Sequence, residues 1–283
     1  MAMSLDALPL ALVLLAALMH AGWNMIAKLG DDRLVAMALI KAPNILLSCA
    51  VLAFVGLPSA ESWPYLLGST VVNCLYFYFL IHAYRAGDLS LAYPVARGTA
   101  PVLVLALAAV AVGELPTPAA FAGVTLICFA ILALGMQRHA PAKHEALLWA
   151  GGVGLCIALY TVIDGIGGRL SGTPVGYVAV LNVFTGVAIC GTTACLRGRV
   201  FLQALRSNWM NGLLGGTMML ASYAIVVYAL TLAPMAQVAA LRETSVIFAA
   251  LLGALLLREP FGAKRIVASI GVAAGIAILA LGG

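Results

Sequence analysis

An apolar run that carries polar residues, LSLAYPVARGTAPVLVLALAAVAVGE (residues 89–114), constrains the fold of this chain more than any other stretch. It is long enough to cross a bilayer as a helix, which takes about 20 apolar residues. The run nevertheless contains Arg97, Pro94 and Pro101 and ends at Glu114, although a charge at the centre of a membrane helix costs about 2.5–3.5 kcal/mol. We therefore interpret it as a membrane-spanning helix that does more than anchor the chain.

The same pattern occurs a second time. A shift of 145 residues superposes three pairs of charged or polar residues: Arg97 on Arg242, Thr99 on Thr244 and Glu114 on Glu259. Matches among Ala and Leu carry little weight in so apolar a chain, but three polar matches at one offset are hard to obtain by chance. The sequence therefore predicts two homologous repeats, residues 7–136 and 146–282.

The composition excludes a water-soluble protein. Hydrophobic residues make up 64% of the chain, charged residues make up 9%, and the mean hydropathy is +1.10, whereas soluble domains are about 25% charged. The net charge of +5 comes from basic residues scattered between apolar runs, which argues against nucleic acid and for a lipid bilayer as the partner. The six cysteines form no CxxC pair, so we expect neither a metal nor a cofactor.

Ten apolar runs are long enough to span the membrane, and Gly, Pro or charged residues separate them. The predicted fold class is an all-α polytopic membrane protein with ten transmembrane helices, five in each repeat. The expected spans are residues 7–28, 34–56, 63–84, 89–113, 118–136, 146–167, 174–196, 208–232, 236–257 and 263–281.

The basic residues predict the orientation, because cytoplasmic connections are enriched in Lys and Arg. The odd-numbered connections hold eleven of them and the other face only Arg169, which places those connections in the cytoplasm and both termini outside. The eleven are Lys28, Arg33, Arg85, Arg138, Lys143, Arg197, Arg199, Arg206, Arg258, Lys264 and Arg265. Since five spans are an odd number of crossings, the second repeat should lie inverted, an architecture that can open a central site to either side in turn.

Three segments resemble a known family. They are HAGWNMIAK (residues 20–28), AGDLSLAYPVARGTAP (residues 86–101) followed by VGE, and ALRETSVIFAALLGALLLREP (residues 240–260). These segments are similar to the paired EamA domains of the drug/metabolite transporter superfamily. The resemblance extends over nearly the whole chain and implies ten helices, a location in the bacterial inner membrane, and export or exchange of a small metabolite.

Two intramembrane arginines are the first candidates for a site. Arg97 and Arg242 occupy equivalent positions in inverted copies, so they should face a shared centre. One reading is substrate binding, because guanidinium groups bind carboxylates and phosphates in bidentate fashion. The alternative is internal neutralisation by a carboxylate. Glu243 follows Arg242 directly, but neighbours on a helix point about 100° apart and should not pair easily.

Further candidates lie on the first and sixth spans. His20 and Asn24 share one helix face, and a shift of 140 residues places Tyr160 and Asp164 over them. We predict that His20, Asn24 and Tyr160 contribute to substrate binding, and that Asp164 and Glu243 couple protons, since burial brings a carboxyl group toward its working range. The alternatives are a packing role for His20 and a capping or ion-pairing role for Asp164.

The remaining polar or small residues of interest in the spans are Lys41, Glu114 and the pair Gly271 and Gly275. Lys41 lies too far inside the second span to reach the surface easily, which favours a substrate-binding role facing the cavity. Glu114 should be held by backbone N–H groups of the next helix, because a carboxylate opposes the dipole at a helix C-terminus. Gly271 and Gly275 permit close helix contact, either within the chain or in a homodimer.

The leading hypothesis is a secondary transporter for a small polar metabolite, with an anionic or zwitterionic substrate favoured by the excess of buried positive charge. The alternative is an intramembrane enzyme that uses His20, Asp164 or Glu243 as acid or base. No hydrolase or metalloprotease motif is present, and therefore we expect a protein without catalytic residues.

Overall fold

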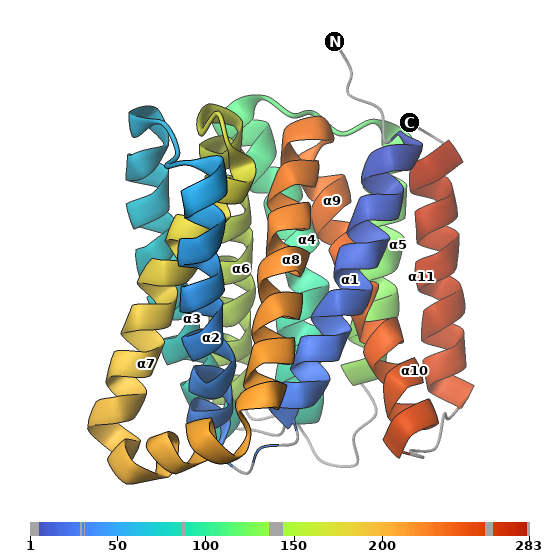
Figure 1. Cartoon of the computed structure of the whole chain (residues 1–283). Coiled ribbons are helices and arrows are strands. Elements are labelled where there is room, and N and C mark those ends of the chain that lie inside the picture. The colour runs from blue at the N-terminus through green and yellow to red at the C-terminus, as the bar shows by residue number, and fades with distance from the viewer. Residues whose placement is uncertain are drawn as a thin grey trace.

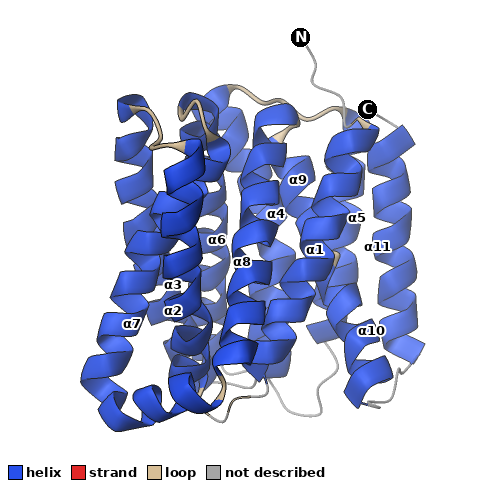
Figure 2. Ribbon diagram, viewed as in Figure 1, coloured by secondary structure: helices blue, strands red, loops and turns tan. Residues whose placement is uncertain are grey.

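The structure, a computed structural model, describes residues 6–28, 30, 32–86, 89–135, 144–257 and 263–281. These residues form helices, and no strand occurs among them (Figure 2). The elements are α1 (Ala7–Lys28), α2 (Arg33–Val55), the 3-10 helix η1 (Ala60–Ser62), α3 (Trp63–Ala86), α4 (Leu89–Val112), α5 (Pro118–Gly135), α6 (His144–Leu170), α7 (Pro174–Ser207), α8 (Trp209–Leu232), α9 (Met235–Arg242), α10 (Ser245–Leu257) and α11 (Ala263–Leu281).

The predicted spans are confirmed as helices. Within the described ranges, 8 helical segments are long and apolar enough to cross a membrane, and α9 with the start of α10 counts as one of them. Two shorter apolar helices, α5 and α11, complete a set of about ten crossings. The chain is therefore an all-α polytopic membrane protein.

Two spans depart from the prediction. The ninth is two helices, α9 and α10, with a break at Glu243 and Thr244. The seventh does not end near residue 196 but continues as α7 to Ser207, and it bends at Gly198, whose φ of 39° is a left-handed value that glycine adopts without strain. The Arg-Gly-Arg sequence around Gly198 therefore marks a bend inside a helical segment, not a loop.

Polar residues start the helices on either side of the bundle. Asp32 caps α2 by accepting hydrogen bonds from the backbone N–H groups of Leu34 and Val35. Nε of Arg197 on α7 also donates to Asp32 at 2.6 Å, and this hydrogen bond lowers the pKa of the Asp32 carboxyl group. At the opposite end, Thr173 caps α7 and Pro174 occupies its first turn.

The helices alternate in direction, and the two halves of the chain pack against each other throughout (Figure 1). The start of α1 and the end of α11 lie at one end of the bundle. In the same view α1 and α6 run in opposite directions, as do α4 and the α9–α10 pair. The most extensive packing joins α3 to α6, α2 to α7, α4 to α6, α5 to α11 and α1 to α8. Neither half forms a separate bundle.

Small residues allow α5 and α11 to approach closely. A Cβ atom added at Gly275 would lie 2.6 Å from Cγ1 of Ile127 and 3.0 Å from the carbonyl oxygen of Gly123, and one at Gly271 would lie 2.9 Å from Cβ of Ala130. The Gly271/Gly275 spacing is therefore used inside the chain.

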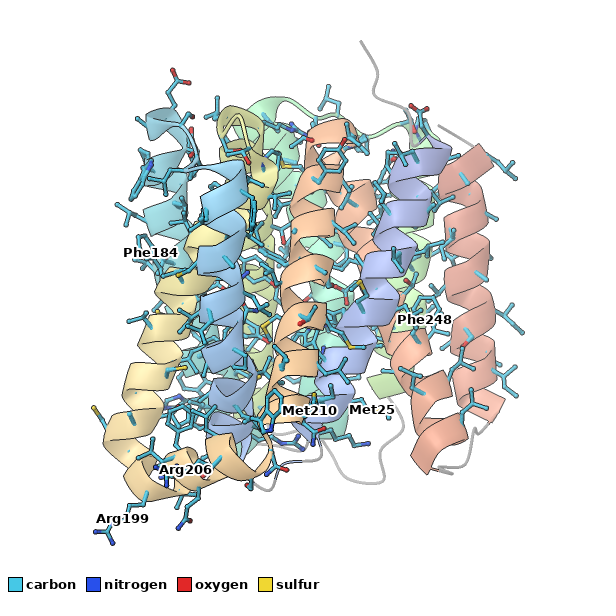
Figure 3. The ribbon with its side chains drawn as sticks, viewed as in Figure 1. Met25, Phe184, Arg199, Arg206, Met210 and Phe248 are labelled. Atoms are coloured by element: carbon cyan, nitrogen blue, oxygen red, sulfur yellow. The ribbon has the colours of Figure 1, made fainter. Side chains whose placement is uncertain are left out.

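The outside of the bundle is apolar and one end is basic. Large apolar side chains such as Phe54, Val110 and Leu255 are more than three-quarters exposed, as a lipid-facing surface requires. Arg199 and Arg206 lie at the end opposite to the termini (Figure 3).

Four residues discussed above lie outside the described residues: Arg138, Lys143, Arg258 and Glu259.

Candidate functional site

The break between α9 and α10 presents two charged side chains to the interior. The backbone turns tightly there, with hydrogen bonds from Glu243 N to Ala240 O and from Thr244 N to Leu241 O, both at 3.1 Å. The Thr244 hydroxyl also donates to Leu241 O at 2.7 Å, which satisfies that carbonyl with a side chain. Arg242 is 3% exposed and Glu243 is 1% exposed, so both charges are buried.

Arg97 of α4 contacts Glu243, which lies at the break between α9 and α10. Nη1 of Arg97 donates to Oε1 of Glu243 at 2.9 Å, and Nε of Arg242 lies 4.0 Å from the same oxygen. One carboxylate thus faces two guanidinium groups. The expectation that Arg242 and Glu243 do not pair easily assumed a continuous helix, and it is corrected to the extent of this 4.0 Å approach.

His20 of α1 completes this group. Nη2 of Arg97 lies 2.5 Å from Nε2 of His20. A guanidinium group has no acceptor, so Nε2 must accept and His20 must be neutral, with its proton on Nδ1. The ring also makes an edge contact with Trp23, with centroids 4.9 Å apart. The arginine therefore fixes both the position and the tautomer of His20.

Tyr160 of α6 contacts the second arginine. Nη2 of Arg242 donates to the Tyr160 hydroxyl at 3.3 Å, and the guanidinium carbon lies 5.7 Å from the centroid of the ring, within the range of a cation–π contact. The ring of Tyr160 also lies near those of Tyr76 and Tyr223, with centroids 6.3 and 6.5 Å away. Aromatic side chains thus line the cluster on the α3, α6 and α8 side.

Asp164, one helical turn further along α6, is held by hydroxyl groups. The Tyr177 hydroxyl of α7 donates to Oδ1 at 2.9 Å and the Tyr223 hydroxyl of α8 donates to Oδ2. Asp164 is fully buried, and neither helix capping nor pairing with Arg169 occurs. Tyr177 and Tyr223 were not candidates from the sequence. The available signal was that a buried tyrosine needs a hydrogen-bond partner.

Two predicted site residues have no direct bond to the arginine cluster. The Asn24 amide donates to the carbonyl oxygen of His20 at 2.8 Å, a contact within α1. Lys41 of α2 donates to Asn182 and Thr185 of α7, at 2.9 and 3.1 Å. The structure brings together Arg97, Arg242, Glu243 and His20, with Tyr160 beside them.

Several buried polar atoms around the break have no hydrogen-bond partner among the described residues. They are Nε of Arg242, Oε2 of Glu243, Oγ of Ser245 and, on α9, Oε1 of Gln237. Leaving such a group unsatisfied costs about 1–3 kcal/mol, so native proteins retain it where a ligand or water is bound. The set includes donors and acceptors, which suits a ligand that carries both.

Glu114 joins four helices at the end that carries the termini. Its Oε1 accepts from Nη2 of Arg169 at 2.5 Å and its Oε2 accepts from the backbone N–H of Met235 at 2.7 Å. Arg169 also donates through Nε to the carbonyl oxygen of Leu230 at 2.9 Å. The prediction of a backbone N–H partner for Glu114 is confirmed, but that partner belongs to the start of α9, not to α5.

A separate apolar cavity lies between α4 and α5. It has a volume of about 420 Å³, and its lining includes Gly98, Val102, Cys128 and Leu132. None of the buried charged residues described above lines it, so the polar cluster is a distinct feature.

The fold and the buried ion cluster together define a class: a polytopic α-helical membrane protein with a polar centre. Residues 144–281 match the model of the EamA-like transporter family. The resemblance to EamA-type transporters is thereby confirmed for the second half of the chain, and this match suggests a membrane transporter of the drug/metabolite superfamily.

Solved structures share the fold. One crystal structure, described only as "Crystal structure of protein", has a TM-score of 0.78 and 18% identity, with 97% of this chain and 96% of the other covered. At this identity the likeness establishes the fold alone. No curated protein matches the sequence.

Proposed function

We propose that this protein is a secondary transporter that exports or exchanges a small anionic or zwitterionic metabolite by alternating access. The observation that carries the proposal is the convergence of Arg97 and Arg242 on Glu243. Each arginine comes from a different half of the chain, and the three side chains are at most 7% exposed. Charges buried in a membrane protein mark a pathway for substrate or ions.

An inverted repeat is supported by reciprocal packing. If residues 7–136 and 146–282 are related by a two-fold axis in the membrane plane, each contact should have a symmetry mate. The α3–α6 contact has its mate in α1–α8, while α2–α7, α4–α9 and α5–α11 join predicted equivalents. Equivalent residues also resemble each other: the hydroxyls of Thr99 and Thr244 both donate to a backbone carbonyl of the preceding turn, to Val95 O at 2.8 Å and to Leu241 O at 2.7 Å.

Contacts near the proposed axis support it as well. A residue close to a two-fold axis should touch its own equivalent. Lys41 bonds Asn182, and Ile45 packs on Gly186, and both pairs are separated by 141 residues (182 − 41 and 186 − 45). Two successive contacts at one sequence separation along α2 and α7 are expected if a two-fold axis passes between these helices.

The unpartnered donor and acceptor atoms of Arg242 and Glu243 suggest the class of substrate. Nε of Arg242 is a donor that could bind an oxyanion, and Oε2 of Glu243 is an acceptor that could bind an ammonium group. A zwitterion presents both groups, and Tyr160 could supply an aromatic face to its cationic end. An anionic substrate without an amine would use the arginines alone.

For proton coupling we propose Glu243 and Asp164. Glu243 has an open carboxylate oxygen beside the arginines, so a proton and a substrate cation would compete for the same atom. Asp164 has both oxygens bonded to tyrosines, so its protonation would require the hydroxyls to turn. An intramembrane enzyme is less well supported, because its three acid or base candidates are engaged: Arg97 holds His20 and Glu243, and two tyrosines hold Asp164.

The proposed location is the bacterial inner membrane, with the basic end of the bundle in the cytoplasm and both termini outside. This follows from Arg199 and Arg206 at the end opposite to the termini. A homodimer stays a prediction, and Gly271 and Gly275 do not support it because α5 occupies them.

Substitution of the two arginines tests the proposal. Arg97→Ala and Arg242→Ala should each remove saturable uptake by liposomes containing the purified protein and lower substrate affinity at least tenfold, since each removes a charged partner. Arg206→Ala, at the basic end, is the matched control and should transport normally. Wild-type affinity in both interior variants would contradict the site, provided that each variant remains monodisperse in detergent.

A further inference from the structure

Lys41 is a buried cation apart from the arginine cluster. It lies on α2, eight residues after Arg33 (41 − 33), or about 12 Å along the helix at 1.5 Å per residue. Its exposed fraction is 8%. Both of its hydrogen-bond partners, Asn182 and Thr185, are neutral, and no carboxylate in the described part of the chain lies within ion-pairing distance.

Asn182 adds an unpartnered donor at the same place. The ammonium group of Lys41 can only donate, so the amide atom that it contacts must be Oδ1, and the orientation of the amide is fixed. Nδ2 is consequently the other amide atom. It is buried and has no hydrogen-bond partner among the described residues. Asn182 as a whole is 4% exposed, so bulk water does not reach it.

Thr185 is a neutral partner of Lys41 and has no hydrogen left to donate. Its hydroxyl accepts from Lys41 at 3.1 Å and donates its hydrogen to the carbonyl oxygen of Leu181 at 2.9 Å. The thiol of Cys190, on the same helix, donates to the carbonyl oxygen of Ala38 at 3.6 Å. The N–H groups that remain open are the third N–H of Lys41 and the N–H groups of Asn182, and these can only donate.

The two sets of donors are close enough to share one ligand. Nζ of Lys41 lies 2.9 Å from Oδ1 of Asn182, and the two heavy atoms of an amide are about 2.3 Å apart, so Nζ and Nδ2 are separated by at most about 5 Å. Hydrogen bonds of about 3 Å from each nitrogen can therefore meet on one acceptor. A positive charge with only donors around it selects an acceptor that is negatively charged.

We propose that Lys41 and Asn182 bind one small monovalent anion, of the size of chloride, between α2 and α7. The anion supplies the counter-charge that Lys41 lacks among the described residues. A buried ammonium group without one carries a desolvation penalty that neutral hydrogen bonds offset only in part. Because the anion bridges the two halves of the chain, its binding stabilises their packing.

Thermal unfolding of the purified protein in detergent tests this site without any substrate. At constant ionic strength and pH, replacement of gluconate by chloride should raise the Tm of the wild type by about 2–4 °C in a saturable manner, since a ligand that binds only the native state stabilises it. Lys41→Met should abolish the dependence on chloride. Lys28→Met, which removes a lysine at the exposed end of α1, is the matched control and should retain it.

Two further variants make the result decisive. Asn182→Asp places a carboxylate beside Lys41, so it should raise the Tm in gluconate and remove the response to chloride, even if Lys41→Met does not fold. Arg97→Ala should keep the response, and its loss there would place the anion at the arginine cluster instead. An identical wild-type Tm in chloride and gluconate would overturn the proposal, while leaving the proposed transport function untouched.

Discussion

The two helices that carry the equivalent arginines differ in continuity. α4 contains Pro94 and Pro101, one on each side of Arg97, yet it is helical from Leu89 to Val112. The ninth span has no proline between Met235 and Leu257, yet it breaks immediately after Arg242. Local helix-breaking residues therefore do not decide where the chain opens.

Packing accounts for the continuity of α4. A Cβ atom added at Gly154 of α6 would lie 2.5 Å from Oγ1 of Thr99 and 3.0 Å from the carbonyl oxygen of Ala96. On the other side, a Cβ atom at Gly98 would lie 2.6 Å from Cγ of Leu132 on α5. Two neighbouring helices thus hold α4 at the level of Arg97.

In the ninth span, contacts of buried charged residues account for the break in the helix. Glu243 bonds Arg97 across the bundle, and Nε of Arg242 lies 4.0 Å from the same carboxylate oxygen, an approach that adjacent positions of a regular helix do not readily allow. The Thr244 hydroxyl then caps the carbonyl of Leu241. The comparison teaches that the break lies where buried ions meet, with tight-turn backbone bonds and one hydroxyl in place of the regular helical bonds.

Removal of the shared carboxylate should have the largest effect. Glu243→Gln leaves Arg97 and Arg242 buried without a counter-charge, and breaking a buried pair costs about 3–5 kcal/mol. We expect a large loss of thermal stability in detergent and, if Glu243 couples protons, a transport rate that no longer depends on pH. Glu61→Gln, at an exposed position, should behave as wild type. Wild-type stability in Glu243→Gln would break the link between the ion pair and the α9–α10 break.

An intermediate effect is expected where α6 packs on α4. Gly154→Ala forces a methyl group against Thr99 and Ala96 and should destabilise the protein by about 1–3 kcal/mol. Gly151→Ala, one turn earlier on α6, meets nothing within 4 Å and should be neutral or slightly stabilising. Thermal unfolding of the two variants side by side measures the difference. Equal stability would mean that packing on α6 does not hold α4 straight.

The smallest loss of stability is expected for substitutions of the equivalent threonines, Thr99 and Thr244. Thr244→Val removes the hydroxyl that caps the break and should cost about 0.5–1.5 kcal/mol. Thr99→Val should cost less, because its hydroxyl only adds to the helical bonds of a continuous α4. Chemical denaturation in matched detergent reports both. A larger loss for Thr99→Val would reverse the roles assigned to the two helices.

The sequence predicted much of the site but not its connections. Arg97, Arg242 and Glu243 stood out because charges are rare in apolar spans, and each is buried in the structure. Tyr177 and Tyr223 did not stand out, because aromatic residues are ordinary in membrane helices. Their bonds to Asp164 depend on how α7 and α8 lie against α6, and no spacing within one helix encodes that.

What the sequence alone determined is the approximate number of spans and where most of them lie, because the thickness of a bilayer fixes how many apolar residues a crossing helix needs. It also determined which polar residues enter the membrane. Only the tertiary structure decided that one carboxylate faces two arginines, that the ninth span breaks, and that Lys41 meets Asn182. These outcomes depend on distances between helices remote in the sequence, and packing of the two halves sets those distances.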